Sequence, residues 1–319
     1  MLKPHMTCLG NDVYFGTFPL AQLTTVEARF LHECDGSRTL AECAKAATAD
    51  AVCVARLSSW LLWWERPVPS APMPKGPIDR LVLAARHTAP WLGMGGRLAL
   101  DAASKRTLVV TCFGSLGENR FVEAFPSASE VSAACHDEVE LVARLTGVQQ
   151  QIWDFPDDAR RQMLFTTGLD VDDLAADTTR AQVLDLIESL RPSEVFAPAA
   201  LDSSADALLL FNTVLSSFAT GNLEAELHFY EDAPVIDGCR PIDEFLARFE
   251  NSYLAPQTYY VDIAPAFHEK SALASGFRCT IDQHDATAWL QSAARNGSLA
   301  LPTTGFAERF WRLDAAAVL

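Results

Sequence analysis

Apolar residues follow two alternating patterns along the chain beyond residue 78. Short, partly β-branched apolar runs alternate with longer stretches in which apolar residues recur at helical spacing. The runs at 80–85, 107–112, 150–153 and 194–197 are predicted to be strands, and those at 95–104, 127–146, 178–190 and 204–218 helices. Buried short strands alternating with helices are typical of a mostly parallel sheet covered on both faces. The sequence therefore predicts a Rossmann-like α/β domain.

The N-terminal part of the chain carries a different pattern. Helical spacing at 24–32 is followed by a capping-box pattern, Thr39 to Glu42, which predicts the start of a second helix, and a third is expected at about 50–64. Residues 67–77 then contain five prolines and a glycine, which oppose both helix and interior strand. We expect a small helical or winged-helix module at 1–66, a Pro-rich linker at 67–77 and the α/β domain at 78–319.

Charge and composition narrow the class of protein. The net charge of −16 disfavours nucleic-acid binding, because such proteins need a cationic face for the phosphate backbone. No run reaches the roughly 18 apolar residues of a membrane helix, and the first residues contain no apolar signal segment. The eight cysteines form no C-x-x-C pair, which favours buried reduced thiols. We therefore expect a cytoplasmic protein that binds neither nucleic acid nor membrane.

Candidate chemistry lies directly after the first predicted strand. Ligands of parallel sheets bind outside the carboxyl ends of the strands, so the residues that follow each strand matter most. Here Arg86, His87 and Thr88 form a polar turn, and Trp91 stands just before the glycine-rich sequence LGMGG. Such a turn before a helix suits an anion or a metal ion.

The sequence around this turn resembles a known family. The frame LVLAA…LGMGGRLAL, followed by TLVVTCFG, is similar to the LmbE/PIG-L zinc-dependent N-deacetylases, which act on N-acetylglucosamine-type substrates. Further motifs follow in the family's order: a helix containing Glu138, WDFPD at 153–157, FAP at 196–198, FYED at 229–232 and ERFW at 308–311. The resemblance spans roughly residues 78 to 315 and implies the deacetylase fold.

The family's catalytic residues are nevertheless replaced. Its His-Pro-Asp-Asp-Glu motif falls on Arg86, His87, Thr88, Ala89 and Pro90. The resemblance therefore puts Arg86 and Ala89 at zinc-ligand positions and Thr88 at that of the general base. The third ligand position, in the family's His-x-Asp-His motif, is Ala207, so that only Asp206 survives. A catalytic zinc needs about three protein ligands, and arginine stays protonated. We expect no metal and no other cofactor.

Several interpretations of this site stay open. Arg86 either binds a ligand carboxylate or phosphate, or forms an internal ion pair with Asp206 or Asp154. His87 is one position away from a ligand position and has no accompanying ligands, so we do not assign it to a metal. Trp91 and Tyr230 either line a pocket or pack in the core. The candidate ligand-binding residues are Arg86, His87, Thr88, Trp91, Asp154, Ser204, Asp206 and Tyr230, with no catalytic or metal-binding residue assigned.

Residues 17–66 resemble a second, smaller family. The sequence FPLAQLTTVEARFLHECDGSRTLAECAKA is similar to the PqqD-type winged-helix module, which presents a strand edge and a groove to a leader peptide. A plain docking module is the alternative, with Trp60, Trp63 and Trp64 packing on the main domain or another chain.

Two functions follow from these resemblances. We expect either a pseudoenzyme that binds a small anionic, sugar-like or peptide ligand or supports a partner enzyme, or a metal-independent enzyme with altered chemistry. A homo-oligomer is compatible with both.

Overall fold

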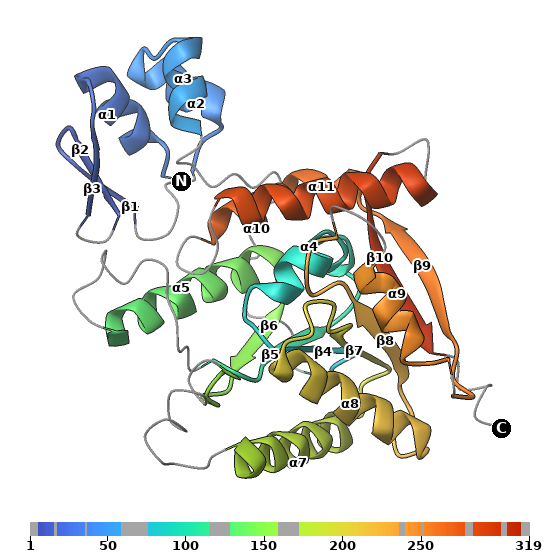
Figure 1. Cartoon of the computed structure of the whole chain (residues 1–319). Coiled ribbons are helices and arrows are strands. Elements are labelled where there is room, and N and C mark those ends of the chain that lie inside the picture. Colours follow the sequence, from blue (N-terminus) through green and yellow to red (C-terminus); the bar gives the residue numbers. More distant parts are fainter. Residues whose placement is uncertain are drawn as a thin grey trace.

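The main domain is a seven-stranded sheet between two layers of helices (Figure 1). The computed structural model describes residues 6–15, 18–35, 37–58, 76–114, 128–158, 172–235, 240–250, 252–277, 283–300 and 305–313. The sheet order is β6-β5-β4-β7-β8-β10-β9, in which the first five strands are parallel and β10 is antiparallel to both of its neighbours. The strands are β4 (Arg80–Ala84), β5 (Thr107–Thr111), β6 (Gln149–Ile152), β7 (Glu194–Pro198), β8 (Glu226–Tyr230), β9 (Pro256–Asp262) and β10 (Ala307–Leu313).

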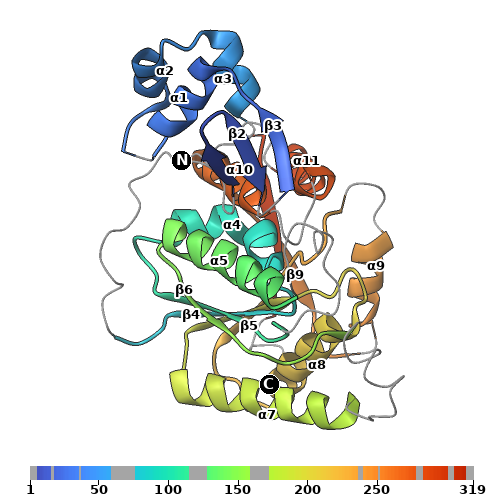
Figure 2. The same cartoon turned by 90° about the vertical axis from the view of Figure 1, so that its left-hand side faces the viewer.

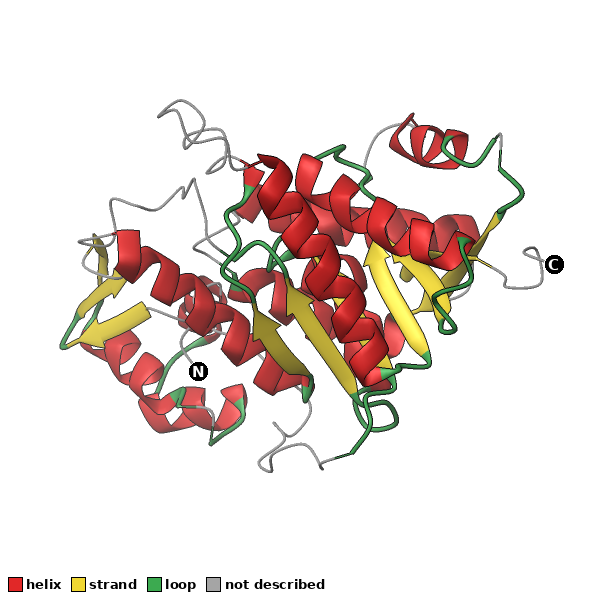
Figure 3. Cartoon of the chain, turned by 90° about the horizontal axis from the view of Figure 1, so that it is seen from below, coloured by secondary structure: helices red, strands yellow, loops and turns green. Residues whose placement is uncertain are grey.

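Each face of this sheet is covered by its own helices (Figures 2 and 3). Alternate residues of a strand point to opposite faces, so Leu81 and Leu83 of β4 join one buried cluster and Val82 joins the other. The helices on the first face are α7 (Asp172–Leu190), α8 (Ala205–Ala219) and α9 (Arg240–Ala247), and those on the second are α4 (Ala89–Asp101), α5 (Ala128–Thr146), α10 (Phe267–Gly276) and α11 (Gln283–Ala300). The predicted mostly parallel α/β fold is confirmed. Within the described ranges, no helix is both long and apolar enough to cross a membrane.

The predicted elements differ from the observed ones mainly at the C-terminal side. All four predicted strands are present, and α8 begins after its N-cap Ser204, as its pattern indicates. The helix predicted to begin at 95 begins at Ala89, because a proline is tolerated in the first turn, where its missing N–H has no helical partner. Strands β8 to β10 and helices α9 to α11 were not predicted. The strand β10 carries two charged residues, Glu308 and Arg309, that are buried in the structure.

The N-terminal module contains a sheet that the sequence did not predict. Strands β1 (Met6–Leu9), β2 (Asp12–Phe15) and β3 (Phe18–Gln22) form an antiparallel sheet in that order. The expected helices follow as α1 (Thr25–Glu33), α2 (Leu40–Ala47) and α3 (Ala51–Ser58), the first two with complete capping boxes. Ala134 and Cys135 of α5 belong to the buried cluster of this module. The three tryptophans at 60, 63 and 64 and linker residues 67–75 lie outside the described residues, and the domain boundaries stay a prediction.

Helix α4 bends at Met94, and a carboxylate caps its second half. Met94 has non-helical dihedral angles (φ −133°, ψ 17°), so the helix restarts with free amides. Glu308 of β10 accepts hydrogen bonds from the backbone N–H groups of Gly96 and Arg97, each 2.8 Å long. The buried ammonium of Lys270 lies 2.7 Å from the same carboxylate and also donates to the carbonyl of Leu92.

Two glycines of the LGMGG sequence allow neighbouring elements to approach this bend. A Cβ atom on Gly93 would stand 1.9 Å from the backbone carbonyl oxygen of Glu231, and one on Gly96 would stand 2.8 Å from Ile263. The glycines therefore serve close packing of α4 on the ends of β8 and β9, and they do not form a phosphate-binding loop.

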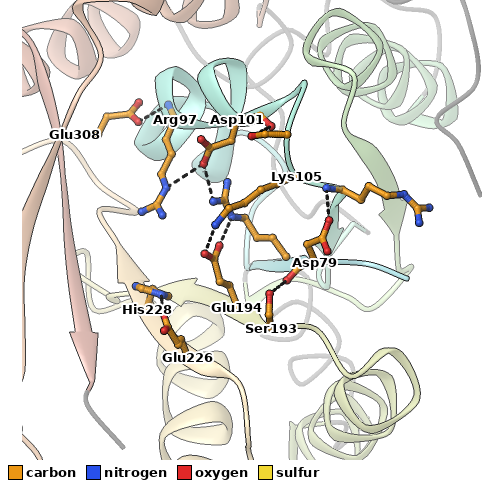
Figure 4. Close-up of polar contacts among 12 residues, drawn as sticks. Asp79, Arg97, Asp101, Lys105, Ser193, Glu194, Glu226, His228 and Glu308 are labelled. Atoms are coloured by element: carbon orange, nitrogen blue, oxygen red, sulfur yellow. Dashed lines mark hydrogen bonds and ion pairs between the residues drawn. The ribbon is translucent and has the colours of Figure 1, made fainter. Parts of the chain in front are cut away.

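A second charged network lies at the amino ends of the parallel strands (Figure 4). The fully buried Arg80 donates to Glu194 at 2.8 Å and to Asp101 at 2.6 Å, and Lys105 bonds the other oxygen of Glu194. Burial opposes ionisation of Glu194, but the hydrogen bonds and charges of Lys105 and Arg80 prevail and lower its pKa to about 2. The charged groups at the amino ends of β4 and β7 are thus paired with one another.

Replacing Glu308 by alanine is expected to destabilise the fold strongly. The variant leaves the ammonium of Lys270 buried without its carboxylate and the amides of Gly96 and Arg97 without an acceptor, a loss of about 3–5 kcal/mol in the free energy of unfolding. Urea denaturation of the variant and the wild type measures this difference in the free energy of unfolding. Glu224→Ala, at an exposed glutamate, is the control and should change stability by less than ~0.5 kcal/mol. Adding Lys270→Met to Glu308→Ala should recover part of the loss, and no recovery would contradict the pairing.

Candidate functional site

The predicted site lies where the order of the strands reverses. From β4 the chain moves outward through β5 to β6, and it then returns to form β7 on the other side of β4. The crevice between the carboxyl ends of two such strands is the usual ligand site of open α/β sheets. Loop residues 85–88 follow β4, and residues 199–204 follow β7. Most of the predicted site residues belong to these loops and to the first turns of α4 and α8.

Arg86 presents its guanidinium group to solvent at this edge. Its side chain is 64% exposed, and its one described charged contact is with Asp202, at 3.6 Å. Of the two alternatives left open by the sequence, the described contacts include no internal ion pair of Arg86 with Asp206 or Asp154, and the contact with Asp202 lies at the surface. Thr88 occupies the N-cap position of α4 and makes no side-chain capping bond there. A single loose contact leaves most of the N–H donors of Arg86 available to a ligand.

His87 points into the core between α4 and α5. Its side chain is 2% exposed, and neither ring nitrogen has a hydrogen-bond partner in the described structure. Burial, and then the charges of His136 and Arg86, lower the pKa of His87 to about 4. The Nε2 atom of His136 on α5 and the hydroxyl of Thr111 on β5 are also buried without a described partner. The side chain following Arg86 thus belongs to the interior.

Asp206, which the sequence resemblance aligns with the family's second motif, accepts a bond from the backbone of an earlier segment of the chain. Asp206 is 3% exposed, and its Oδ2 atom accepts a hydrogen bond of 3.0 Å from the backbone N–H of Asp158. Ser204 caps α8 by accepting from the amide of Ala207. Asp154 is exposed beside the end of β6, where it forms an isolated bridge with Phe113. Ser204 and Asp206 therefore position the start of α8.

The two aromatic candidates are core residues. Trp91 and Tyr230 are both fully buried in the cluster beneath α4. The hydroxyl of Tyr230 donates to the carbonyl of Leu83, 3.0 Å away, and burial raises the pKa of Tyr230. Of the two interpretations left open by the sequence, packing in the core describes both residues.

The loop after β7 contains backbone strain that long-range contacts hold in place. Ala200 and Ser203 have positive φ angles of 53° and 55°, a conformation that costs energy for residues other than glycine. Arg248 donates to the carbonyl oxygens of residues 199 and 200 at 2.8 and 2.9 Å. The carboxylate of Asp232 accepts from the amide of Leu201 at 3.0 Å. These contacts present Asp202 toward Arg86.

Sequence analysis missed Asp202, Asp232 and Arg248. Asp232 lies in the FYED motif and Asp202 lies two residues before the N-cap of α8, so their places at strand ends could have been noted. Nothing in the sequence indicated Arg248, because its contact depends on how α9 packs on the sheet. Burial, partly offset by the bond from Leu201 and reinforced by the charge of Asp202, raises the pKa of Asp232 to about 7.

The described residues contain no metal-binding cluster, and the large cavity that they line lies away from the predicted site. Among the residues that the structure describes, no group of three or more His, Cys, Asp or Glu side chains is placed to hold a metal ion. A cavity of about 1110 Å³ lies between α7 and α8 at the opposite, amino end of β7 and β8. Its lining includes Arg191, Asn212 and Glu226 but none of the predicted site residues.

Comparison with known proteins finds likeness in structure and none in sequence. No family profile and no curated protein sequence match the chain. A deacetylase of the teicoplanin biosynthesis pathway matches 74% of this chain and 97% of its own, at 14% identity and a TM-score of 0.51. N,N'-diacetylchitobiose deacetylase from Pyrococcus horikoshii matches 83% of this chain and 93% of its own, at 17% identity and a TM-score of 0.51. GalB, the 4-carboxy-2-hydroxymuconate hydratase from Pseudomonas putida, matches 74% and 96%, at 15% identity and a TM-score of 0.52. The chain therefore has the fold of LmbE/PIG-L-type deacetylases.

Buried His87 is expected to make the fold sensitive to mild acid. Above pH 6.5 the imidazole is neutral in both the folded and the unfolded chain, so it contributes no pH dependence. Between pH 6.5 and about 4 only the unfolded chain takes up the proton. The free energy of unfolding therefore decreases as the pH is lowered through this range, by roughly 3 kcal/mol in total. Chemical denaturation at a series of pH values measures this slope.

The His87→Gln variant removes the titrating ring and should flatten that part of the profile. His32→Gln, at an exposed histidine of α1, is the matched control. If the difference in unfolding free energy between His87→Gln and the wild type is the same at pH 7 and pH 4.5, the assignment of His87 as a buried neutral imidazole is wrong.

Proposed function

We propose that this chain is a deacetylase-fold protein that binds a ligand at the carboxyl edge between β4 and β7 and does not hydrolyse it with zinc. One observation carries the proposal: the guanidinium of Arg86 is exposed at this edge, and the sequence resemblance puts Arg86 at the position of the family's first zinc ligand. The same resemblance puts Thr88, Ala89 and Ala207 at the positions of the base and the other two ligands. These side chains do not fit a catalytic zinc, which needs three protein ligands.

The exposed Arg86 supports an anionic group on the ligand. A guanidinium offers five N–H donors in a plane and pairs with a carboxylate or phosphate through two parallel bonds. Its contact with Asp202 at 3.6 Å is longer than a hydrogen bond, so an anionic group can replace it at small cost. We propose a small anionic, sugar-like or peptide ligand, with support of a partner enzyme as the role that such binding would serve.

A metal-independent enzyme is the second candidate function, and Asp232 favours it. This half-buried carboxyl stands beside Asp202 at the end of β8, and a group whose pKa is about 7 exchanges protons efficiently at neutral pH. The hydratase with a similar fold supports the idea that the fold serves reactions other than deacetylation.

The N-terminal module supports a further, compatible role in binding a leader peptide. Its three-stranded sheet precedes three helices, and the outer strands β1 and β3 each have one described strand neighbour, as β-augmentation requires. A groove of about 430 Å³ runs between the starts of α1 and α3, with the exposed Val26 and Val52 and the carboxylate of Asp50 on its walls. We propose an extended peptide with apolar and basic residues for this groove.

Purified wild-type protein is expected to bind no zinc tightly at the carboxyl edge. Metal analysis and isothermal titration with zinc measure this, and one tightly bound zinc per chain would contradict the proposal. The matched control restores the family residues with Arg86→His, Thr88→Asp, Ala89→Asp and Ala207→His, and this variant should gain one zinc.

The metal-independent enzyme is tested by turnover of N-acetylated amino sugars with metal-free wild-type protein. Turnover that Arg86→Ala or Asp232→Asn abolishes, at an unchanged melting temperature, would favour the enzyme.

Peptide binding by the module is best tested in the full-length chain, because Ala134 and Cys135 of α5 pack in its core. Val52→Lys should weaken binding of an apolar, basic leader peptide at least about tenfold, because it removes an apolar contact and places a cation beside the basic residues of the peptide. Leu299→Lys, at an exposed apolar residue of α11 outside the groove and outside the three-stranded sheet, is the control. Affinity that is unaltered by Val52→Lys would exclude this groove.

A further inference from the structure

Strand β9 forms one edge of the central sheet. The sheet order ends in β9, whose one described strand neighbour is β10 (Figure 1). β9 has seven residues in unbroken register with β10, whereas β6 at the opposite edge has four. A long, regular edge strand offers a row of backbone N–H and C=O groups to another strand.

The bonds between β9 and β10 show which residues of β9 direct their backbone N–H and C=O groups toward β10 and which direct them away from the sheet. Residues of an antiparallel pair alternate between bonding across the pair and pointing away from it. The amide of Ile263 donates to the carbonyl of Phe306 at 3.2 Å, so Val261, Tyr259 and every second residue before them also bond toward β10. The backbone groups of Thr258 and Tyr260 therefore point away from the sheet, and no contact from another described residue uses them.

The pairing of β10 with β8 independently gives the same alternation of bonding and outward residues. The carbonyl of Tyr230 on β8 accepts from the amide of Ala199, after β7, at 3.0 Å. Tyr230 stands opposite Phe310 of β10, so Phe310 bonds to the other side, toward its β9 partner Tyr259.

The composition of β9 does not protect this edge. Natural edge strands are usually blocked by lysine, by a proline in the strand or by a bulge. Residues 257–261, the interior of β9, contain no charged side chain and no proline in a chain of net charge −16. Pro256 begins the strand and Asp262 ends it, and the register with β10 has no bulge.

We propose that a second copy of this chain pairs with β9 in antiparallel fashion about a two-fold axis at Tyr259. This register overlaps all seven residues and brings Thr258 opposite Tyr260 of the partner subunit. Because both residues point outward, the two exchange a pair of backbone hydrogen bonds on each side of the axis. A two-fold contact of one surface with itself is the commonest form of homo-oligomer. The two sheets then form one continuous sheet.

Charge at the new contact is compatible with a pair of identical strands. In this register Asp262 stands opposite Pro256 of the partner subunit, so the two aspartates lie at opposite ends of the contact, about 20 Å apart. Direct repulsion between them is therefore small at ordinary ionic strength. The charge of −16 on each whole chain still opposes association, so added salt should strengthen the dimer.

Sedimentation velocity of the full-length chain over a range of protein and salt concentrations tests the proposal. The wild type should sediment as a monomer–dimer equilibrium that shifts to dimer with salt. Thr258→Pro removes an outward N–H and no bond to β10, so it should give a monomer with an unchanged melting temperature. Thr258→Val keeps the N–H and should dimerise like the wild type. A wild type that stays monomeric under all conditions overturns the proposal, and so does a dimer that persists in Thr258→Pro.

Hydrogen exchange locates the contact independently of any variant. The amides of Thr258 and Tyr260 should become protected as protein concentration rises, whereas those of Tyr259 and Val261, bonded to β10, should be protected at all concentrations. A dimer in which Thr258 and Tyr260 exchange rapidly at every concentration would place the interface elsewhere and overturn the proposal.

Discussion

The carboxylate of Glu308 joins three parts of the main domain that are far apart in the sequence. It accepts from the amides at the restart of α4, it pairs with Lys270 on α10, and it belongs to β10, which connects β8 to β9. The bend in α4 leaves amides that need an acceptor, and an ammonium in the same interior needs a counter-charge. One buried side chain satisfies both, so the direction of α4 depends on a strand more than 200 residues later.

The direction of α4 in turn fixes what the loop after β4 presents. Trp91 is buried beneath the first half of the helix, and His87 is buried between α4 and α5, so Arg86 is the side chain of this loop that reaches solvent. The amino ends of the strands show the opposite arrangement, because Arg80 there is fully enclosed by Glu194 and Asp101. The protein thus has one end of the sheet where charges pair internally and one where a cation and nearby aspartates face outward. That contrast supports the proposal that a ligand binds at the carboxyl edge.

The fold and the chemistry of this protein are separate matters. The same arrangement of sheet and helices is found in two deacetylases and a hydratase, and their identities with this chain are 14–17%. The reversal of strand order between β4 and β7 belongs to the topology of the sheet and does not depend on the side chains of the loops. In the function proposed for this edge, the ligand is recognised by the few side chains in the loops, such as Arg86, Asp202 and Asp232.

The amino-acid sequence by itself determined four of the five parallel strands and the starts of several helices. Runs such as 80–84 and 107–111 are apolar throughout because both faces of these strands are covered, and Thr39 and Ser204 mark helix starts through local bonds. It also put Arg86 at the strand end.

Only the tertiary structure decided the rest. The antiparallel strand β10 escaped prediction because the charges of its Glu308 and Arg309 are buried through partners distant in sequence. The pairing of Arg86 with Asp202, the burial of His87 and the outward backbone of β9 likewise depend on which segments meet. Local patterns report whether a residue is apolar, but the partner of a buried charge is set by the packing of the whole chain.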